Sequence, residues 1–426
     1  MSLTLFVIFC LISCFLIIKD PFWGTVIYLV AVFFRFQDYL PQLEGFPLAL
    51  LILLLTTIVG FAKGAFAGIG LSNISLVVLL YVIVIGIAPL LQGIEVTRYS
   101  EHLGKAYYAL LLVALIRSKE KMELYGFALF GTILFLAFML FKAYYYGGSD
   151  YIYWRENRPY GQGLLENPNA IVVWLNYGVI FASFLFVTTA KLYMKGVYSV
   201  CILFLLYDNM LCMSRGGTIG LALAVFLLFF FLKGKERIII LLALTVIGVF
   251  VFQRGNIHYY TRMSQMAGET ETGEIEGSAG ERLNSWANGL DIIKSNLFFG
   301  VGANNIMQHN FRVNSDGSLE GRALHNGYLE IFAENGIFGA GLWLLILLLS
   351  CLNLFSYRRI GKVGEKNMVF TKWNKIFLCC YGPLGASLMF GSKQYTVFIF
   401  ILAGVSAVLK KLNDVEISSK RPLFRR

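Results

Sequence analysis

The chain has 426 residues, of which 58% are hydrophobic and 14% are charged, and its mean hydropathy is +0.69. Soluble domains carry about 25% charged residues, so this composition excludes a soluble globular protein. In a soluble protein the net charge of +11 would suggest nucleic-acid binding. In a membrane protein Lys and Arg instead collect in cytoplasmic connections, so we expect an integral membrane protein that contacts lipids and binds no nucleic acid.

The apolar residues occur in long runs separated by polar connections. A run of about 18 or more apolar residues with few charges predicts a membrane-spanning helix. Several connections are basic, and placing all of them in the cytoplasm gives a consistent alternation of spans with a cytoplasmic C-terminus. The pattern predicts an all-α integral membrane protein with about 12–13 transmembrane helices. The predicted spans are 2–18, 21–36, 46–62, 74–92, 103–117, 122–146, 168–189, 196–213, 216–232, 238–253, 328–356, 376–391 and 394–410.

Four regions follow from this pattern. Residues 1–253 are predicted to form transmembrane helices with a short external loop at 147–167. Residues 254–327 form a large external loop, and residues 328–410 form the C-terminal transmembrane helices. Residues 411–426 form a basic cytoplasmic tail.

The large external loop contains a predicted amphipathic helix over residues 279–295. Its apolar residues Leu283, Trp286 and Leu290 recur at helical spacing. Ser278 and Glu281 have the spacing of a capping box, which explains this part of the motif by helix initiation alone. Arg282 is not needed for a capping box, so it is a candidate for binding. The later Gly300-Val-Gly302 follows no predicted strand and is interpreted as a turn.

His325 lies where the large loop meets the next predicted span, in the sequence Arg322-Ala-Leu-His-Asn-Gly-Tyr-Leu-Glu330. A lone His is most often structural. This one, however, is followed by Glu330 and Glu334, which lie one turn apart near the top of a span. Charged groups at that depth are costly and usually face a cavity. A His in such a place titrates near neutral pH and could act as a general base.

Two further polar motifs fall on the same predicted face of the membrane. In Ser214-Arg215-Gly-Gly, between two spans, the Arg either reaches the lipid headgroups or offers a fork of donors to phosphate oxygens. The glycines there would let a diphosphate approach the backbone. The segment from Arg155 to Asn169, which includes Arg158, is either an ordinary polar loop or a further source of cations.

Several Arg and one His thus gather at one face, and no metal-ligand spacing, Asp-rich pair or Walker-type loop accompanies them. This set suits a substrate that brings its own diphosphate leaving group. The Arg residues would neutralise that group, and a base would activate an acceptor hydroxyl. We therefore expect no metal and no cofactor.

The same motifs resemble those of the O-antigen ligase and polymerase superfamily of bacterial membrane glycosyltransferases. The His325-Asn326 helix entry continues through Leu329, Glu330 and the Gly336-Ile-Phe-Gly339 step. The order of the remaining motifs is also similar, and these are Asn167-Pro-Asn169, Ser214-Arg215-Gly216, Ser278-Ala-x-x-Arg282, Trp286 and Phe299-Gly-Val-Gly302. The resemblance lies in motifs from about residue 150 to 350 and elsewhere in the pattern of spans. The acidic, Gly-rich stretch 268–280 is a departure from the family pattern, because its length does not align clearly with that of the family.

The resemblance implies a GT-C-like helical bundle in the bacterial inner membrane, with its external loops in the periplasm and short helices in the large loop. It implies a glycan donor on undecaprenyl diphosphate and a metal-independent, inverting transfer. His325, Arg215 and Arg282 would be catalytic, with His325 as the base and the two Arg at the donor diphosphate. The residues expected to contact substrate are Arg158, Asn169, Ser214, Asn326 and Glu330.

Three functions remain open at this point. The preferred one is O-antigen ligation, in which the acceptor is lipid A-core. The second is an O-antigen or exopolysaccharide polymerase, or a protein O-oligosaccharyltransferase, with the same donor and another acceptor. The third is a non-catalytic transporter of the same lipid. Transporters often show internal repeats and mid-span charges, and the absence of a visible repeat here favours an enzyme. The oligomeric state is not predicted.

Overall fold

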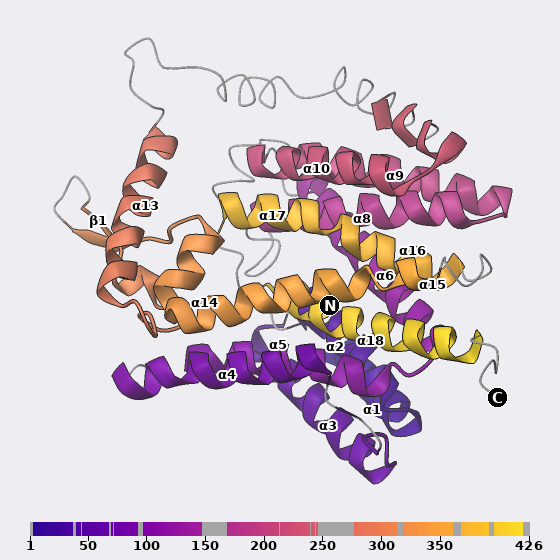
Figure 1. Cartoon of the computed structure of the whole chain (residues 1–426), viewed down its shortest axis with the longest axis horizontal. Coiled ribbons are helices and arrows are strands. Elements are labelled where there is room, and N and C mark those ends of the chain that lie inside the picture. Colours follow the sequence, from indigo (N-terminus) through magenta and orange to yellow (C-terminus); the bar gives the residue numbers. More distant parts are fainter. Residues whose placement is uncertain are drawn as a thin grey trace, which may run out of the picture.

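The structure is a computed structural model, and it describes residues 3–36, 40–43, 45–67, 70, 72–92, 97–146, 168–212, 214–238, 240–242, 244–245, 277–313, 318–360, 368–391 and 396–420. Apart from one short antiparallel strand pair, its regular elements are helices (Figure 1). The N-terminal helices are α1 (Leu3–Lys19), α2 (Phe22–Phe34), η2 (Pro41–Leu43), α3 (Leu48–Ala62), α4 (Asn73–Gln92), α5 (Thr97–Leu115) and α6 (Lys119–Tyr146). The middle helices are α8 (Pro168–Thr188), α9 (Leu192–Leu211) and α10 (Arg215–Phe231). The remaining elements are α13 (Gly277–Ser295), η4 (Ile306–Gln308), β1 (Phe311–Val313), β2 (Leu319–Gly321), α14 (Gly327–Leu354), α15 (Tyr357–Ile360), α16 (Met368–Cys379), α17 (Tyr381–Phe390) and α18 (Val397–Lys420).

The predicted class, an all-α membrane protein, is confirmed. Within the described residues, α6, α8, α9 and α14 each contain a stretch long and apolar enough to cross a membrane. Shorter apolar helices, such as α2 and α3, accompany them. The number of spans stays a prediction, because most of the span expected at 238–253 lies outside the described residues.

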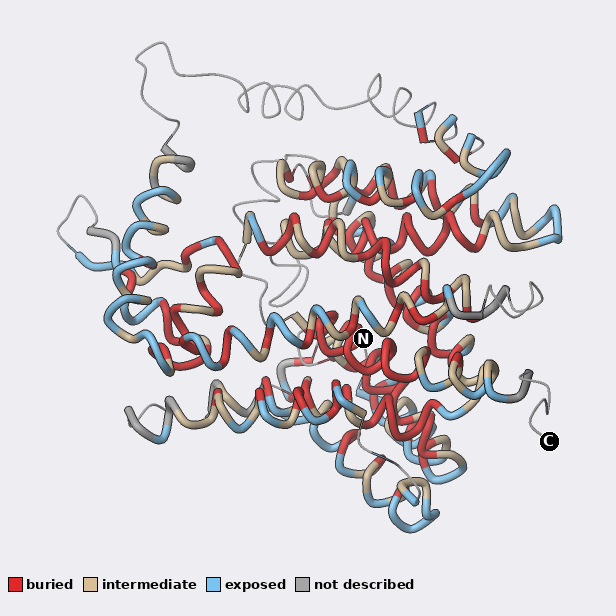
Figure 2. Tube along the Cα trace, viewed as in Figure 1, coloured by how far each residue is buried: buried red, intermediate tan, exposed pale blue. Residues whose placement is uncertain are grey.

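The core of the bundle is formed by helices that are apolar on every side. Residues of α8 and of the first half of α18 are almost all buried, whereas α1 and α3 expose many apolar side chains. Figure 2 shows this contrast between inner and outer helices. A helix that is hydrophobic all round belongs either in a core or against lipid. The outer helices therefore present the lipid-facing surface of the protein.

The basic connections between helices meet at one end of the bundle. Lys121 pairs with Asp20 at 2.7 Å, and Lys63 donates to the carbonyl of Lys19 at 2.7 Å. Farther along the chain, Lys372 pairs with Glu123 at 3.4 Å. Helix α13 and the β1–β2 hairpin lie at the opposite end (Figure 1). These basic connections therefore lie at the end of the bundle opposite to α13 and the hairpin, while the alternation and sidedness of the spans stay predictions.

Two predicted elements differ from the observed ones. The span expected over 376–391 is made of two consecutive helices, α16 and α17, which meet at Cys380. Pro383 lies in the first turn of α17 and has no N–H to donate to the helix before it, which accounts for the break. Helix α18 continues past residue 411 to Lys420, and Asn413 on it donates to the hydroxyl of Ser356 at 2.7 Å. The basic tail thus begins as helix.

Helix α14 contains a break at Gly336, whose φ of 60° and ψ of −171° are not helical. The break leaves the carbonyls of Ala333 and Glu334 without their intrahelical donors. The N–H groups of Val301 and Gly302 donate to these carbonyls at 2.9 and 2.8 Å. In return, the N–H of Ile337 donates to the carbonyl of Leu297 at 2.8 Å. The turn predicted at 300–302 is thereby joined to the membrane helix by backbone hydrogen bonds.

Glycine is required on both sides of this junction. A Cβ on Gly336 would lie 2.2 Å from the carbonyl oxygen of Phe298, and one on Gly300 would lie 2.3 Å from the carbonyl carbon of Glu334. Both glycines have a positive φ, which is unfavourable for a residue with a side chain. The close approach of the two backbones therefore depends on these two positions.

We predict that Gly336→Ala destabilises the protein by at least about 1–3 kcal/mol, because it combines left-handed strain with a clash against backbone. The measurement is the apparent Tm of the purified protein in detergent. Gly341→Ala is the matched control, because that glycine lies on the same helix with open space around it. Equal Tm values for the two variants would contradict the prediction.

Candidate active site

His325 lies on a tight turn at the entry to α14. Its φ is 54°, a left-handed conformation that is uncommon for a residue with a side chain, and the residue is exposed. The N–H groups of Leu324 and His325 both donate to Oε1 of Glu330, at 2.7 and 3.1 Å. Glu330 is only 1% exposed. The buried carboxylate therefore holds the backbone of the turn and leaves the imidazole at the surface.

Asn326 begins α14 as its N-cap. Its Oδ1 accepts from the N–H groups of Tyr328 and Leu329 at 3.1 and 3.2 Å, which satisfies two donors of the first turn. The next residue, Gly327, donates its N–H to the carbonyl of Gly391 at the end of α17, at 3.1 Å. The His325 turn is therefore attached to two helices of the bundle.

Ser214 and Asn169 join the starts of α10 and α8. The Ser214 hydroxyl donates to Oδ1 of Asn169 at 2.6 Å and accepts from the N–H of Gly217 at 3.1 Å, so it is also the N-cap of α10. Arg215 is the first residue of that helix. A Cβ on Gly217 would meet Val172 at 2.4 Å, so this glycine permits close packing of α10 on α8. Close packing of the two helices therefore accounts for Gly217, where the sequence suggested space for a diphosphate to approach the backbone.

Arg282 lies on α13, close enough to Arg215 for the two positive charges to interact. Arg282 is half-buried, and its pKa is lowered, first by burial and then by the positive charge of Arg215. One turn later on α13, Trp286 donates its indole N–H to the carbonyl of Leu324 at 2.9 Å. Leu324 directly precedes His325. Helix α13 therefore brings Arg282 toward both Arg215 and the His325 turn.

The electrostatics of this region favour an anion. Two neighbouring guanidinium groups repel each other, and an anion between them would relieve that repulsion while accepting bidentate hydrogen bonds. Arg215 also begins a helix, whose N-terminus carries a partial positive charge. Bound phosphates would be held near an exposed imidazole, which is the arrangement that phosphate-leaving-group chemistry needs.

The structure gathers most of the predicted site residues at one end of the bundle. Direct contacts connect Asn169 to Ser214, and the shared turn connects His325, Asn326 and Glu330. Arg158 lies outside the described residues. Within the described residues, no group of three or more His, Cys, Asp and Glu is placed to hold a metal ion.

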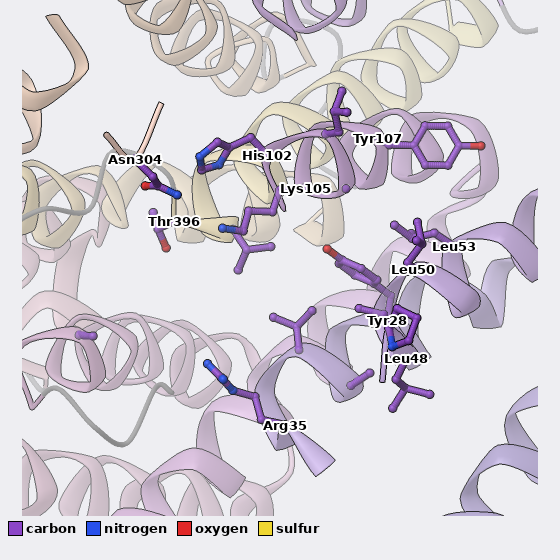
Figure 3. Close-up of a pocket in the computed structure, with 18 of the residues that line it drawn as sticks. Tyr28, Arg35, Leu48, Leu50, Leu53, His102, Lys105, Tyr107, Asn304 and Thr396 are labelled. Atoms are coloured by element: carbon purple, nitrogen blue, oxygen red, sulfur yellow. The ribbon is translucent and has the colours of Figure 1, made fainter. Parts of the chain in front are cut away.

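A large cavity beneath this end was not predicted from the sequence. Its volume is about 1150 Å³, and Arg35, His102 and Lys105 are among the residues that line it (Figure 3). His102 and Lys105 lie on α5, whose first turns carry several polar residues. That polarity was the available signal, because ionisable groups at the end of a span usually face a cavity.

The fold and this polar end define a membrane protein with a cation-bearing site where a long loop folds back onto a broken helix. Residues 197–344, from α9 into α14, match the family model described as O-antigen ligase. This match confirms, over these residues, the predicted resemblance to the O-antigen ligase and polymerase superfamily.

The chain is also similar to a Haemophilus influenzae strain Rd protein described only as uncharacterized. The two are 28% identical over 192 residues, which is 41% of this chain and 48% of that protein. The similarity therefore spans about half the length of the relative.

We predict that the carboxylate of Glu330 fixes the backbone of the His325 turn. Glu330→Ala would leave the N–H groups of Leu324 and His325 without their acceptor, at a cost of about 1–3 kcal/mol if they stay buried. Glu330→Gln keeps one acceptor oxygen and should cost less. Hydrogen exchange at the amides of residues 324 and 325 should accelerate strongly in Glu330→Ala. Unchanged exchange in that variant would contradict the role.

Proposed function

We propose that the protein is a glycosyltransferase that moves a glycan from undecaprenyl diphosphate to an acceptor hydroxyl at the periplasmic face of the inner membrane. Lipid A-core is the preferred acceptor. The observation that carries this proposal is that Arg282, whose charge interacts with that of Arg215, lies on the helix whose Trp286 donates to the backbone of the His325 turn. The match of residues 197–344 to the O-antigen ligase family supports the same function.

In the proposed reaction, a hydroxyl of the acceptor attacks the anomeric carbon of the donor glycan. The new bond joins that carbon to the acceptor oxygen, and the bond to the diphosphate oxygen breaks on the opposite face, which inverts the configuration. The electron pair of the broken bond remains on undecaprenyl diphosphate. Arg215 and Arg282 stabilise the negative charge that develops there, and no metal is required.

His325 accepts the proton that the acceptor hydroxyl loses. A neutral imidazole suits this role near neutral pH. The backbone of His325 is fixed by Glu330 and by the Asn326 cap, so the imidazole extends from a rigid turn. The left-handed backbone at His325 costs energy, and such strain is common at functional sites.

We predict that His325→Ala lowers the transfer rate by about 100-fold to 10,000-fold, because the acceptor loses its general base. Transfer is measured with purified protein in nanodiscs, a glycan on undecaprenyl diphosphate and rough lipopolysaccharide. His309→Ala is the matched control, because His309 is an exposed His of the same loop. Retained transfer in His325→Ala would rule out the base assignment.

We predict that Arg215→Gln and Arg282→Gln each weaken donor binding by about tenfold or more, because each removes charge-assisted hydrogen bonds to phosphate. Binding of undecaprenyl diphosphate to protein in nanodiscs is the measurement. Arg322→Gln should leave the affinity unchanged, because this guanidinium pairs with Glu320 at 3.1 Å. Wild-type affinity in both Arg215→Gln and Arg282→Gln would remove the diphosphate role.

The products of the same assay decide between the candidate functions. Ligation predicts glycan attached to lipid A-core. Longer glycans that remain on undecaprenyl diphosphate would instead identify a polymerase. The absence of transfer to any acceptor, with intact donor binding, would favour the transporter.

A further inference from the structure

Helix α14 changes its surroundings at the break at Gly336. From Gly327 to Gly336 every residue of the helix is buried or partly buried. Beyond the break, exposed residues recur at helical spacing along one face, and all of them are apolar. These residues are Ile337, Phe338, Gly341, Leu344, Leu345, Leu348 and Leu352. An exposed apolar stripe on a membrane helix faces lipid, so α14 begins to face lipid at Ile337.

The length of α14 beyond the break is close to the thickness of a bilayer. At 1.5 Å per residue, residues 337–354 extend about 27 Å, and a hydrocarbon core is about 30 Å thick. The sequence carries no charged residue between Glu334 and Arg358. Arg358 lies in α15, at the basic end of the bundle (Figure 1). The break at Gly336 therefore lies at the other boundary of the hydrocarbon core, at the loop end.

The large loop reaches this boundary through the segment that follows α13. The N–H of Ile337 donates to the carbonyl of Leu297 at 2.8 Å, so Leu297 lies at the depth where α14 begins to face lipid. The rings of Phe298 and Phe338 stack with their centroids 5.9 Å apart. Phe298 is 59% exposed and Phe338 is 50% exposed. The apolar stripe of α14 thus continues onto the loop.

The backbone of this segment is bonded in the way that lipid requires. Peptide groups without partners are costly at membrane depth, so irregular backbone lies there only when protein satisfies it. The N–H groups of residues 300–302 all donate to carbonyls, at distances of 2.8–2.9 Å. The carbonyl of Leu297 accepts from Ile337. These bonds allow residues 297–302 to lie beside the ends of acyl chains.

Charged side chains end just before the exposed apolar ones. Near the end of α13, Lys294 and Asp291 form an exposed ion pair at 3.0 Å. After Lys294 the sequence has no charged residue until Arg312. Helix α13 packs against α14 and runs across its direction (Figure 1). A change from exposed charges to exposed Leu and Phe within one turn is typical of a segment that passes from headgroups to acyl chains.

We propose that Leu297, Phe298, Ile337 and Phe338 form an interfacial anchor, a surface that binds phospholipid where the headgroups meet the acyl chains. Lipid is the occupant because the exposed area of these side chains continues the lipid-facing stripe of α14. The anchor holds the large loop at the bilayer boundary, and it sets the height of α13 above the membrane. Lipid binding at this surface requires no catalytic activity, so it goes beyond the proposed transfer reaction.

The test is fluorescence quenching in nanodiscs that contain brominated phosphatidylcholine. Phe298→Trp and Leu297→Trp each add an indole, whose emission is the difference between the variant and the wild type with its 6 Trp. Each variant should lose a larger fraction of the added emission when bromine is close to the headgroup than when it is close to the chain ends. Leu345→Trp, nearer the middle of the lipid-facing stripe, should show the reverse order.

Phe311→Trp is the matched control, because Phe311 is an exposed aromatic residue of the same loop that lies on the β1–β2 hairpin. Its added emission should be the same with brominated and unbrominated lipid. The anchor would be overturned if Phe298→Trp and Leu297→Trp were as insensitive to bromine as Phe311→Trp, while Leu345→Trp was quenched. A second copy of the chain or a soluble partner seated on the four residues would give this contradictory result.

Discussion

The geometry of the site depends on the exchange of backbone hydrogen bonds at the break in α14. A membrane helix normally satisfies its own N–H and C=O groups, because lipid offers no alternative partners. At Gly336 that rule is broken, and the carbonyls of Ala333 and Glu334 bond instead to Val301 and Gly302. A flexible loop could not hold a cation and an imidazole in a fixed relation. The exchange makes residues 297–302 part of the bundle, so α13 and the His325 turn are positioned by it.

Helix α14 also connects the proposed donor site with the large cavity. Its first turn carries Asn326 and Glu330, whose side chains fix the backbone of the His325 turn. Donor cations approach that turn from α10 and α13, while the cavity lined by Arg35 and Lys105 approaches it from α2 and α5.

The sequence predicted the elements whose signals are local. Apolar runs predicted most of the observed helices, and the spacing of Leu283, Trp286 and Leu290 predicted α13, which the structure has at Gly277–Ser295. The clustering of Ser214 with Asn169, and of Arg282 with Arg215, was expected because each motif lay at the same predicted face. The helix predictions succeeded because apolar runs and helical spacing mark a helix without knowledge of tertiary contacts.

Features that depend on tertiary contacts could not be predicted in this way. Gly336 is one glycine among 42, and only its contact with Phe298 explains its conformation. Glu330 was expected to contact substrate, yet its carboxylate accepts two backbone N–H groups of the preceding turn. The cavity lined by Arg35 and Lys105 joins residues from helices that are far apart in the sequence from the motifs. The polar first turns of α5 indicate a cavity, but nothing in the local pattern indicates that Glu330 lines the same one.

The central claim is that the donor diphosphate binds between Arg215 and Arg282 while its glycan reaches His325. The most direct measurement is a cryo-EM structure of the protein in nanodiscs with undecaprenyl diphosphate bound. The account predicts phosphate density within hydrogen-bond distance of both guanidinium groups, at the N-terminus of α10. Diphosphate density in the cavity beside Arg35 and Lys105, with none near Arg215 and Arg282, would contradict it.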